Sequence, residues 1–205
     1  IVSIDMYYDY LDREANAQDK ALMILLWNGI SGKKLYSDII NLKVSQYDSQ
    51  NATITLNGKV YYFTDKENEI LKLSQTESCY VYYTEFGEEN KIIPYLNGTH
   101  FIRNVITTKT VNNEENQVSH FTISKRLNML FRKIEAMPVT GDDFITSGVL
   151  HRVSERYDIR SLTLQQIYDI AKNEFETISA NKIFMAKKIL VKRLEEKENL
   201  QSENE

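Results

Sequence analysis

The sequence feature that most restricts the fold of this chain is a run of seven consecutive apolar residues, from Ala21 to Trp27. A helix that is apolar on every side is stable only when it is buried, so the run predicts a central helix around which other elements pack. It is far shorter than the roughly 20 residues that a membrane-spanning helix needs, so we expect no membrane segment. Asn28 and Gly29 follow directly, and both residue types accept the left-handed conformation that ends a helix.

Glycine and proline are scarce, with 7 Gly and 2 Pro in 205 residues. So few chain breaks favour long helices over a sandwich or barrel of many short strands. The chain is 42% hydrophobic and 26% charged, which is enough apolar surface for one core. We therefore predict a mainly α fold with a small antiparallel β-sheet, in one domain over residues 1–205. A helix-start pattern at Ser3, with no initiating Met, leads us to expect the C-terminal part of a longer protein.

A β-hairpin is predicted in the first half of the chain. Thr53–Leu56 and Lys59–Phe63 are rich in β-prone residues and flank Asn57-Gly58, a dipeptide that suits a type I′ turn. We expect Tyr61 and Tyr62 to pack within the sheet rather than to stack on bases. Two further strand-like runs follow, Cys79–Tyr83 and Lys91–Tyr95.

Helix starts are marked by side chains able to accept hydrogen bonds from free backbone N–H groups. Thr64 with Glu67, and Thr163 with Gln166, have the spacing of capping boxes. The polar stretch Thr107–Gln117 predicts a mobile loop. Single N-caps are expected at Ser3 or Asp5, at Ser147 for a helix through Val149, Val153 and Tyr157, and at Ser179 for a long last helix; a short helix is expected around Ile39, Ile40 and Leu42.

Charge is unevenly distributed along the chain, whose formal net charge is −4. Acid gathers in the tail from Glu195 to Glu205, whereas a predicted helix over Thr122–Ile134 combines an apolar face with a basic one. The apolar face carries Ile123, Leu127, Leu130 and Ile134, and the basic face Lys125, Arg126, Arg132 and Lys133. Such a face either contacts phosphate or is an ordinary solvated surface. Further on, Arg152, Arg156 and Arg160 either contact phosphate or pair with Glu155 and Asp158.

Several chemistries find no support in the sequence. Cys79 is the only cysteine, which fits a reducing cytoplasm and excludes an internal disulfide. The histidines, His100, His120 and His151, are too scattered for a metal-ligand motif. No glycine pattern of a nucleotide-binding loop occurs. We therefore predict no metal and no cofactor.

Taken in order, the buried helix, the Gly-containing turn, the short helix and the hairpin resemble the catalytic domain of tyrosine recombinases, the phage integrase family. Ala21–Ile30 followed by Tyr36–Lys43 is similar to the family's first motif, whose turn carries a catalytic Arg. Here the turn has extra residues and no Arg, and Lys33 and Lys34 stand in it. Lys59 matches the Lys that the family places on its hairpin.

Two other family motifs are similar but altered. Thr146–Arg152 occupies the place of an H-x-x-R motif just inside a helix, with Gly148 at the His and His151 at the Arg. Ile178–Phe184 resembles the stretch with the nucleophilic Tyr, and Phe184 takes that position. Phe has no oxygen for attack on a phosphodiester, and His lacks the two-point phosphate contact of Arg. The resemblance thus implies loss of strand cleavage and no catalytic residues. Apart from the resemblance, Ile183, Phe184 and Met185 are expected in the core.

The resemblance as a whole implies a cytoplasmic, integrase-like transcriptional repressor that binds specific double-stranded DNA without cutting it and maintains prophage lysogeny. The residues expected to contact DNA are Lys33, Lys34, Lys59, Lys125, Arg126, Arg132, His151, Arg152 and Arg156.

Two alternatives remain open. One is an active but divergent recombinase that uses another tyrosine, for which Tyr157 and Tyr168 are the nearest candidates. The other is an interaction module without DNA affinity, in which a C-terminal helix over Ser179–Glu198 docks on a neighbour or on a second copy. Residues 179–205 are expected to form this helix and an acidic tail.

Overall fold

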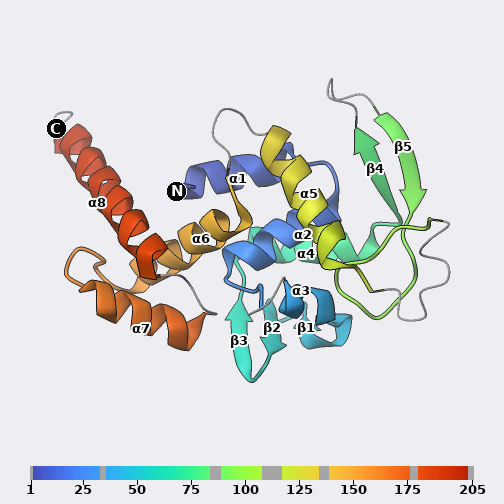
Figure 1. Ribbon diagram of the computed structural model, residues 1–205, viewed down its shortest axis with the longest axis horizontal. Helices are drawn as coiled ribbons and strands as arrows, with labels where there is room; N and C mark the ends of the chain where they lie inside the picture. The colour runs from blue at the N-terminus through green and yellow to red at the C-terminus, as the bar shows by residue number, and fades with distance from the viewer. Residues whose placement is uncertain are drawn as a thin grey trace.

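The structure, a computed structural model, describes residues 2–32, 36–83, 89–107, 117–133, 139–175 and 180–202. Helix α2 (Ala17–Trp27) runs through the middle of the molecule, as Figure 1 shows, and every residue in it except Lys20 is buried. It ends where expected, because Gly29 adopts a φ of +80° that residues with a side chain rarely take. The predicted central helix is confirmed.

Other helices cover α2 from several sides. α4 (Asp65–Thr76) and α6 (Gly141–Arg156) make the widest contacts with it, and α5 (His120–Lys133) also touches it. α1 (Ile4–Arg13) contributes Tyr7, whose ring stacks on Trp27 at a centroid distance of 4.3 Å. Burying two such aromatic rings supplies much of the apolar area that holds α1 against the core.

The small sheet confirms the predicted hairpin. Strands β1 (Tyr47–Asp48), β2 (Thr53–Leu56) and β3 (Lys59–Tyr62) pair antiparallel in that order, after the short helices α3 (Ser37–Asn41) and η1 (Val44–Gln46). Asn57 and Gly58 have φ values of 51° and 75°, as a type I′ turn requires. Tyr61 is buried, but Tyr62 is 70% exposed. The prediction is wrong for Tyr62 because neighbouring side chains on a strand point to opposite faces.

A second ribbon projects from the body at the end opposite α8, as Figure 1 shows. Its strands β4 (Cys79–Tyr83) and β5 (Glu89–Pro94) pair antiparallel and bring Tyr80, Tyr95 and Val105 into a small core of their own. The side chain of Asn16 holds the ribbon to the body, since it donates to the Val81 carbonyl at 3.0 Å and accepts from the Val81 amide at 2.8 Å.

The C-terminal helices start differently from the prediction at one point. Thr140, not Ser147, caps α6 in a capping box with Asp143. Ser147 lies in mid-helix, where its hydroxyl donates to the Asp143 carbonyl at 2.6 Å, a bond that serine makes readily inside helices. The other predicted caps, at Ser3, Thr64 and Thr163, are confirmed.

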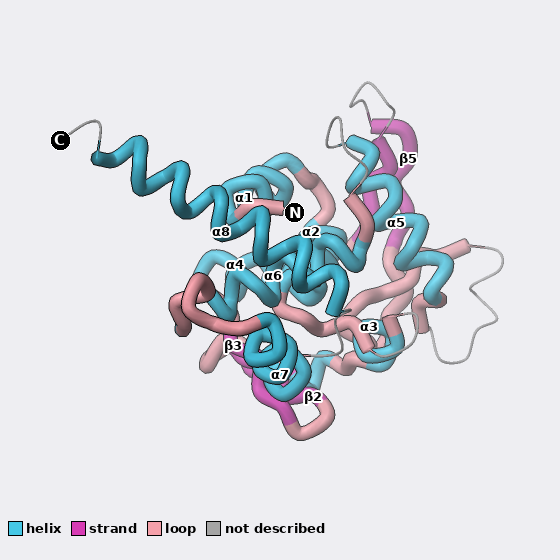
Figure 2. Tube along the Cα trace, turned by 60° about the vertical axis from the view of Figure 1, so that its left-hand side comes forward, coloured by secondary structure: helices cyan, strands magenta, loops and turns pink. Residues whose placement is uncertain are grey.

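The last two helices are α7 (Leu164–Glu174) and α8 (Ala180–Ser202), and the C-terminal half of α8 extends away from the body in Figures 1 and 2. No helix within the described ranges is long and apolar enough to span a membrane. Most of the predicted 107–117 loop and the predicted cap at Ser179 lie outside the described residues. The fold is mainly α with small antiparallel sheets, as predicted.

Candidate nucleic-acid interface

A cavity of about 560 Å³ opens beside the β2–β3 hairpin, and we call it the hairpin pocket. The turn after α2, strand β3, the C-terminal half of α6 and the end of α7 form its walls. Its lining residues are Asn28, Lys59, Val60, Tyr61, Tyr62, Arg152, Glu155, Arg156, Asn173, Glu174 and Phe175. The fold thus brings together three of the predicted DNA contacts, namely Lys59, Arg152 and Arg156.

Arg152 is held at the wall of this pocket by a buried carboxylate. Its Nη2 donates to Glu67 Oε2 at 3.0 Å and to Asn28 Oδ1 at 2.7 Å. Glu67 is fully buried and also accepts a hydrogen bond from the Tyr7 hydroxyl at 2.7 Å. Burial and the neighbouring Glu67 charge raise the pKa of Tyr7 well above its ordinary value. These charge-assisted bonds fix the guanidinium toward the interior.

Arg156 has an ionic partner among the described residues, whereas Lys59 has none. Arg156 Nη1 lies 2.6 Å from Glu174 Oε2, and its guanidinium sits 5.8 Å from the Phe175 ring centroid. Lys59, at the start of β3, is half-buried and forms no ion pair with any described residue. Lys59 is therefore a cation on this pocket that remains available to a phosphate.

Arg126 does not lie on an exposed basic face, so that prediction is wrong. Only 6% of the residue is exposed, and its Nε lies 3.8 Å from Asp19 Oδ1. Its guanidinium stacks over the Tyr80 ring at 4.9 Å. Helical spacing explains the error, because Arg126 is three residues after Ile123 and four before Leu130, on the apolar side of α5. Lys125, its neighbour, is exposed as expected.

His151 faces a different cavity, on another side of α6. Gly148 and His151 lie in the middle of α6, whereas the family motif starts a helix, so the predicted register of this motif is wrong. The four residues just inside the helix, Gly141–Phe144, include no His or Arg. Packing accounts for Gly148, since a Cβ added there would collide with the carbonyl oxygen of Trp27 where α6 crosses α2.

Phe184 lies outside the hairpin pocket. It is 50% exposed and lines a separate cavity with Arg160, Leu164 and Lys187. The core assignment is therefore confirmed for Ile183 but wrong for Phe184 and for Met185, which is also exposed. Lys33, Lys34 and the side chain of Arg132 lie outside the described residues.

Sequence reasoning missed four residues of this region. Glu67 was recognised only as a capping residue and Asn28 only as a helix end, although both bind Arg152. Glu174 and Phe175 carried no local signal, because their contacts with Arg156 join elements that are distant in the sequence. No group of three potential metal ligands occurs among the residues that the structure describes.

The arrangement of these elements is that of a tyrosine recombinase. The crystal structure of XerA recombinase matches with a TM-score of 0.57 and 11% sequence identity, over 90% of this chain and 59% of that chain. This chain thus spans less than two thirds of XerA, and the likeness concerns the fold.

A family relationship is also found. Residues 1–199 match the family described as "MrpR, C-terminal catalytic domain". The chain belongs to this tyrosine recombinase-like family, which confirms the resemblance seen in the sequence. No curated protein matches the chain.

Proposed function

We propose that this chain binds a specific double-stranded DNA site without cutting it and acts as a transcriptional repressor that maintains prophage lysogeny. The observation that carries the proposal is the hairpin pocket, in which Lys59 stands without an ionic partner among the described residues while both arginines are paired. A DNA partner would place the protein in the cytoplasm.

Phosphate contacts supply most of the affinity of such proteins, and lysines provide them as point charges. Lys59 lies at the hairpin tip beside the pocket, and Lys125 is exposed on α5. Neither forms an ion pair within the described part of the chain. We therefore assign phosphate contact first to these two lysines. Lys33, Lys34 and Arg132 stay predicted contacts.

The ion pairs of the two arginines support the absence of cleavage. A recombinase stabilises a charged pentavalent phosphate through free, two-pronged guanidinium groups. Arg152 instead binds Glu67 and Asn28, and Arg156 binds Glu174. Releasing either arginine would leave a carboxylate without its cation, most seriously at fully buried Glu67.

DNA binding is tested with the full-length protein on DNA fragments from upstream of its target genes, at several salt concentrations. We expect one fragment to be retained, and each lost phosphate contact to reduce the slope of log affinity against log salt by about 1. Lys59→Ala/Lys125→Ala should therefore weaken binding and flatten the slope. Lys72→Ala, an exposed lysine on α4 outside the hairpin pocket, is the matched control. Absence of retention at every salt concentration would refute the proposal.

An active recombinase is the second candidate, favoured by one observation. Tyr62 lines the hairpin pocket and is 70% exposed, so its phenol is accessible there. Tyr157 and Tyr168, the candidates from the sequence, do not line this pocket. A nicked DNA substrate that traps covalent intermediates separates the two functions. The repressor proposal expects no adduct, whereas an adduct that disappears with Tyr62→Phe would establish cleavage.

Self-association is a further part of the proposal. α8 carries exposed apolar side chains at Phe184, Met185 and Ile189. We expect these to pair two copies at high concentration, which sedimentation equilibrium would detect. Self-association without DNA retention would favour the pure interaction module.

A further inference from the structure

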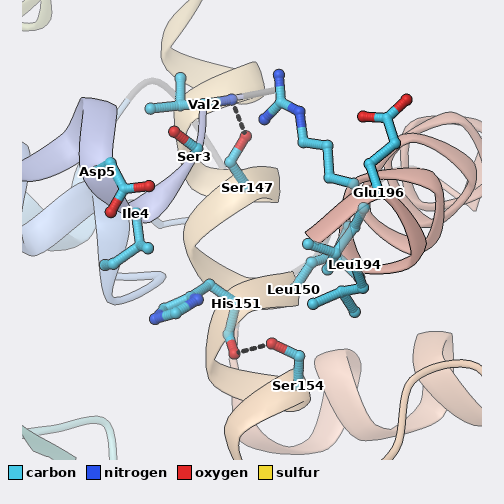
Figure 3. Close-up of a pocket in the computed structure, with 12 residues that line it drawn as sticks. Val2, Ser3, Ile4, Asp5, Ser147, Leu150, His151, Ser154, Leu194 and Glu196 are labelled. Atoms are coloured by element: carbon cyan, nitrogen blue, oxygen red, sulfur yellow. Dashed lines mark hydrogen bonds between the residues drawn. The ribbon is translucent and has the colours of Figure 1, made fainter. Parts of the chain in front are cut away.

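A second cavity of about 500 Å³ lies between α1, α6 and α8, and we call it the α8 cavity. Its size falls within the range of small-molecule sites. Figure 3 shows Val2, Ile4, Leu150 and Leu194 around it, with hydroxyl and charged groups at its edges. The full lining is Val2, Ser3, Ile4, Asp5, Ser147, Leu150, His151, Ser154, Leu190, Arg193, Leu194 and Glu196. An apolar floor with few polar groups is typical of a pocket for an amphipathic molecule.

The hydroxyl groups at this cavity already have partners. Ser147 accepts from the Val2 amide at 2.9 Å, and Ser154 donates to the His151 carbonyl at 2.7 Å, as Figure 3 shows. Ser3 accepts from the Met6 amide as the cap of α1. Recognition of a polar ligand group therefore falls to the charged residues.

Among these charged residues, Arg193 stands apart. It is half-buried and has no ionic or hydrogen-bonding partner within the described part of the chain. Glu196 is paired with Lys192 at 3.7 Å, and Asp5 lies in the first turn of α1, where the helix dipole favours its charge. Asp5 also has a partner. The unpaired charge at the cavity is therefore positive, and it calls for an anionic group.

The α8 cavity is connected to the hairpin pocket by two polar contacts of Glu155. His151 lines the first, and its Nε2 lies 3.4 Å from Glu155 Oε1. The other oxygen of Glu155 lies 3.5 Å from Nη1 of Arg152, which lines the second. His151 and Arg152 therefore share one carboxylate, that of Glu155.

We propose that the α8 cavity binds a small amphipathic organic anion, whose charged group pairs with Arg193 and whose apolar part covers Leu150 and Leu194. In addition, resting on the proposed DNA-binding function, the negative charge of the bound anion favours the protonated form of His151, and this cation draws Glu155 away from Arg152. The hairpin pocket becomes more positive, and DNA binding tightens.

Binding is tested by calorimetry on the full-length protein without DNA, with octanoate, octanol and octylammonium as probes of equal chain length. We expect octanoate to bind one site per chain and the two others to bind at least tenfold more weakly, since a charge-assisted bond is lost. Equal binding of octanol, or no binding of octanoate, would overturn the proposal. Trp27, the only tryptophan, lies 5.9 Å from the His151 ring and provides a fluorescence signal for the same event.

Two variants and a control locate the site. Arg193→Gln should weaken octanoate binding about tenfold, and Leu194→Trp, at a half-buried position, should abolish it by filling the cavity. Lys188→Gln, an exposed lysine on the same helix outside the cavity, should leave affinity unchanged. Unchanged affinity in Arg193→Gln, with the protein folded by circular dichroism, would contradict the assignment.

The connection is tested separately. Octanoate should shift the ring resonances of His151 and tighten DNA binding about fivefold. Glu155→Gln should keep octanoate binding but remove the effect on DNA. If DNA binding itself fails, calorimetry and the His151 resonances still decide whether the cavity binds the anion. Octanoate binding with unchanged DNA affinity would overturn the connection.

Discussion

Two arginine–carboxylate pairs lie in different parts of this molecule, and they differ in how well the buried carboxylate is satisfied. Glu67 accepts hydrogen bonds from Tyr7, Asn28 and Arg152 and from both the amide and the hydroxyl of Thr64, at 2.7–3.3 Å. Asp19 lies near the β4–β5 ribbon and accepts a hydrogen bond from the Tyr80 hydroxyl at 2.6 Å. Nε of Arg126 lies 3.8 Å from Oδ1 of Asp19.

The two environments have different consequences for charge. Oδ1 of Asp19 has no hydrogen-bond partner among the described residues, and burial raises the pKa of Asp19 to about 6 despite Arg126. Desolvation thus outweighs attraction at Asp19, whereas at Glu67 five donor groups replace the lost water. A buried carboxylate is stabilised by the hydrogen bonds it accepts, and a nearby cation does not replace them.

The largest expected effect is the removal of Arg152. Arg152→Ala leaves fully buried Glu67 without its cation, and we expect a loss of about 3–5 kcal/mol in the free energy of unfolding. Urea denaturation measures it. A loss below about 1 kcal/mol would show that the other four donor groups stabilise the Glu67 carboxylate without Arg152, and would remove the contrast with Asp19.

The second effect concerns pH. Because the pKa of Asp19 is raised from 3.8 to about 6 on folding, the native state binds this proton more tightly than the unfolded state. Stability should therefore fall as pH rises from about 4 to about 6, by roughly 3 kcal/mol from this residue. Urea denaturation at several pH values should show this fall in the wild type and not in Asp19→Asn. The same fall in both proteins would contradict the assignment.

A smaller pair of substitutions compares the two carboxylates directly. Tyr80→Phe removes the one side-chain hydrogen bond that Asp19 accepts from a described residue, and Tyr7→Phe removes one of five donor groups at Glu67. We expect losses in unfolding free energy of about 2 kcal/mol and about 1 kcal/mol, respectively. Thermal unfolding at pH 7.5 measures both. A larger loss in Tyr7→Phe than in Tyr80→Phe would show that the number of hydrogen-bond donors does not decide the loss in unfolding free energy.

The smallest effect is expected at Arg156. Its pair with Glu174 is partly exposed, with half of the arginine side chain open to solvent, so Arg156→Ala should cost less than about 1 kcal/mol. The same variant should lower DNA affinity little, because the positive charge of Arg156 is nearly cancelled by the negative charge of Glu174. A tenfold loss of DNA affinity would show instead that Arg156 leaves Glu174 to bind phosphate.

The sequence by itself determined the elements whose signals are local. The apolar run of α2 predicted its central position, Asn57-Gly58 predicted the hairpin, and Thr64 with Glu67 predicted a capping box. Each depends on residues within a few positions of one another, so pattern and propensity suffice. The sequence also placed Lys59 at the hairpin tip, where it reaches the hairpin pocket.

Only the tertiary structure decided which charged side chains meet. Arg126 pairs with Asp19, 107 positions earlier, and Arg152 pairs with Glu67, 85 positions earlier. Neither pair can be predicted from the spacing of nearby residues, because the partners come from helices that approach one another only after the core forms. A cation in the sequence is therefore assigned to DNA or to a buried carboxylate by packing, since burial sets the cost of leaving a charge unpaired.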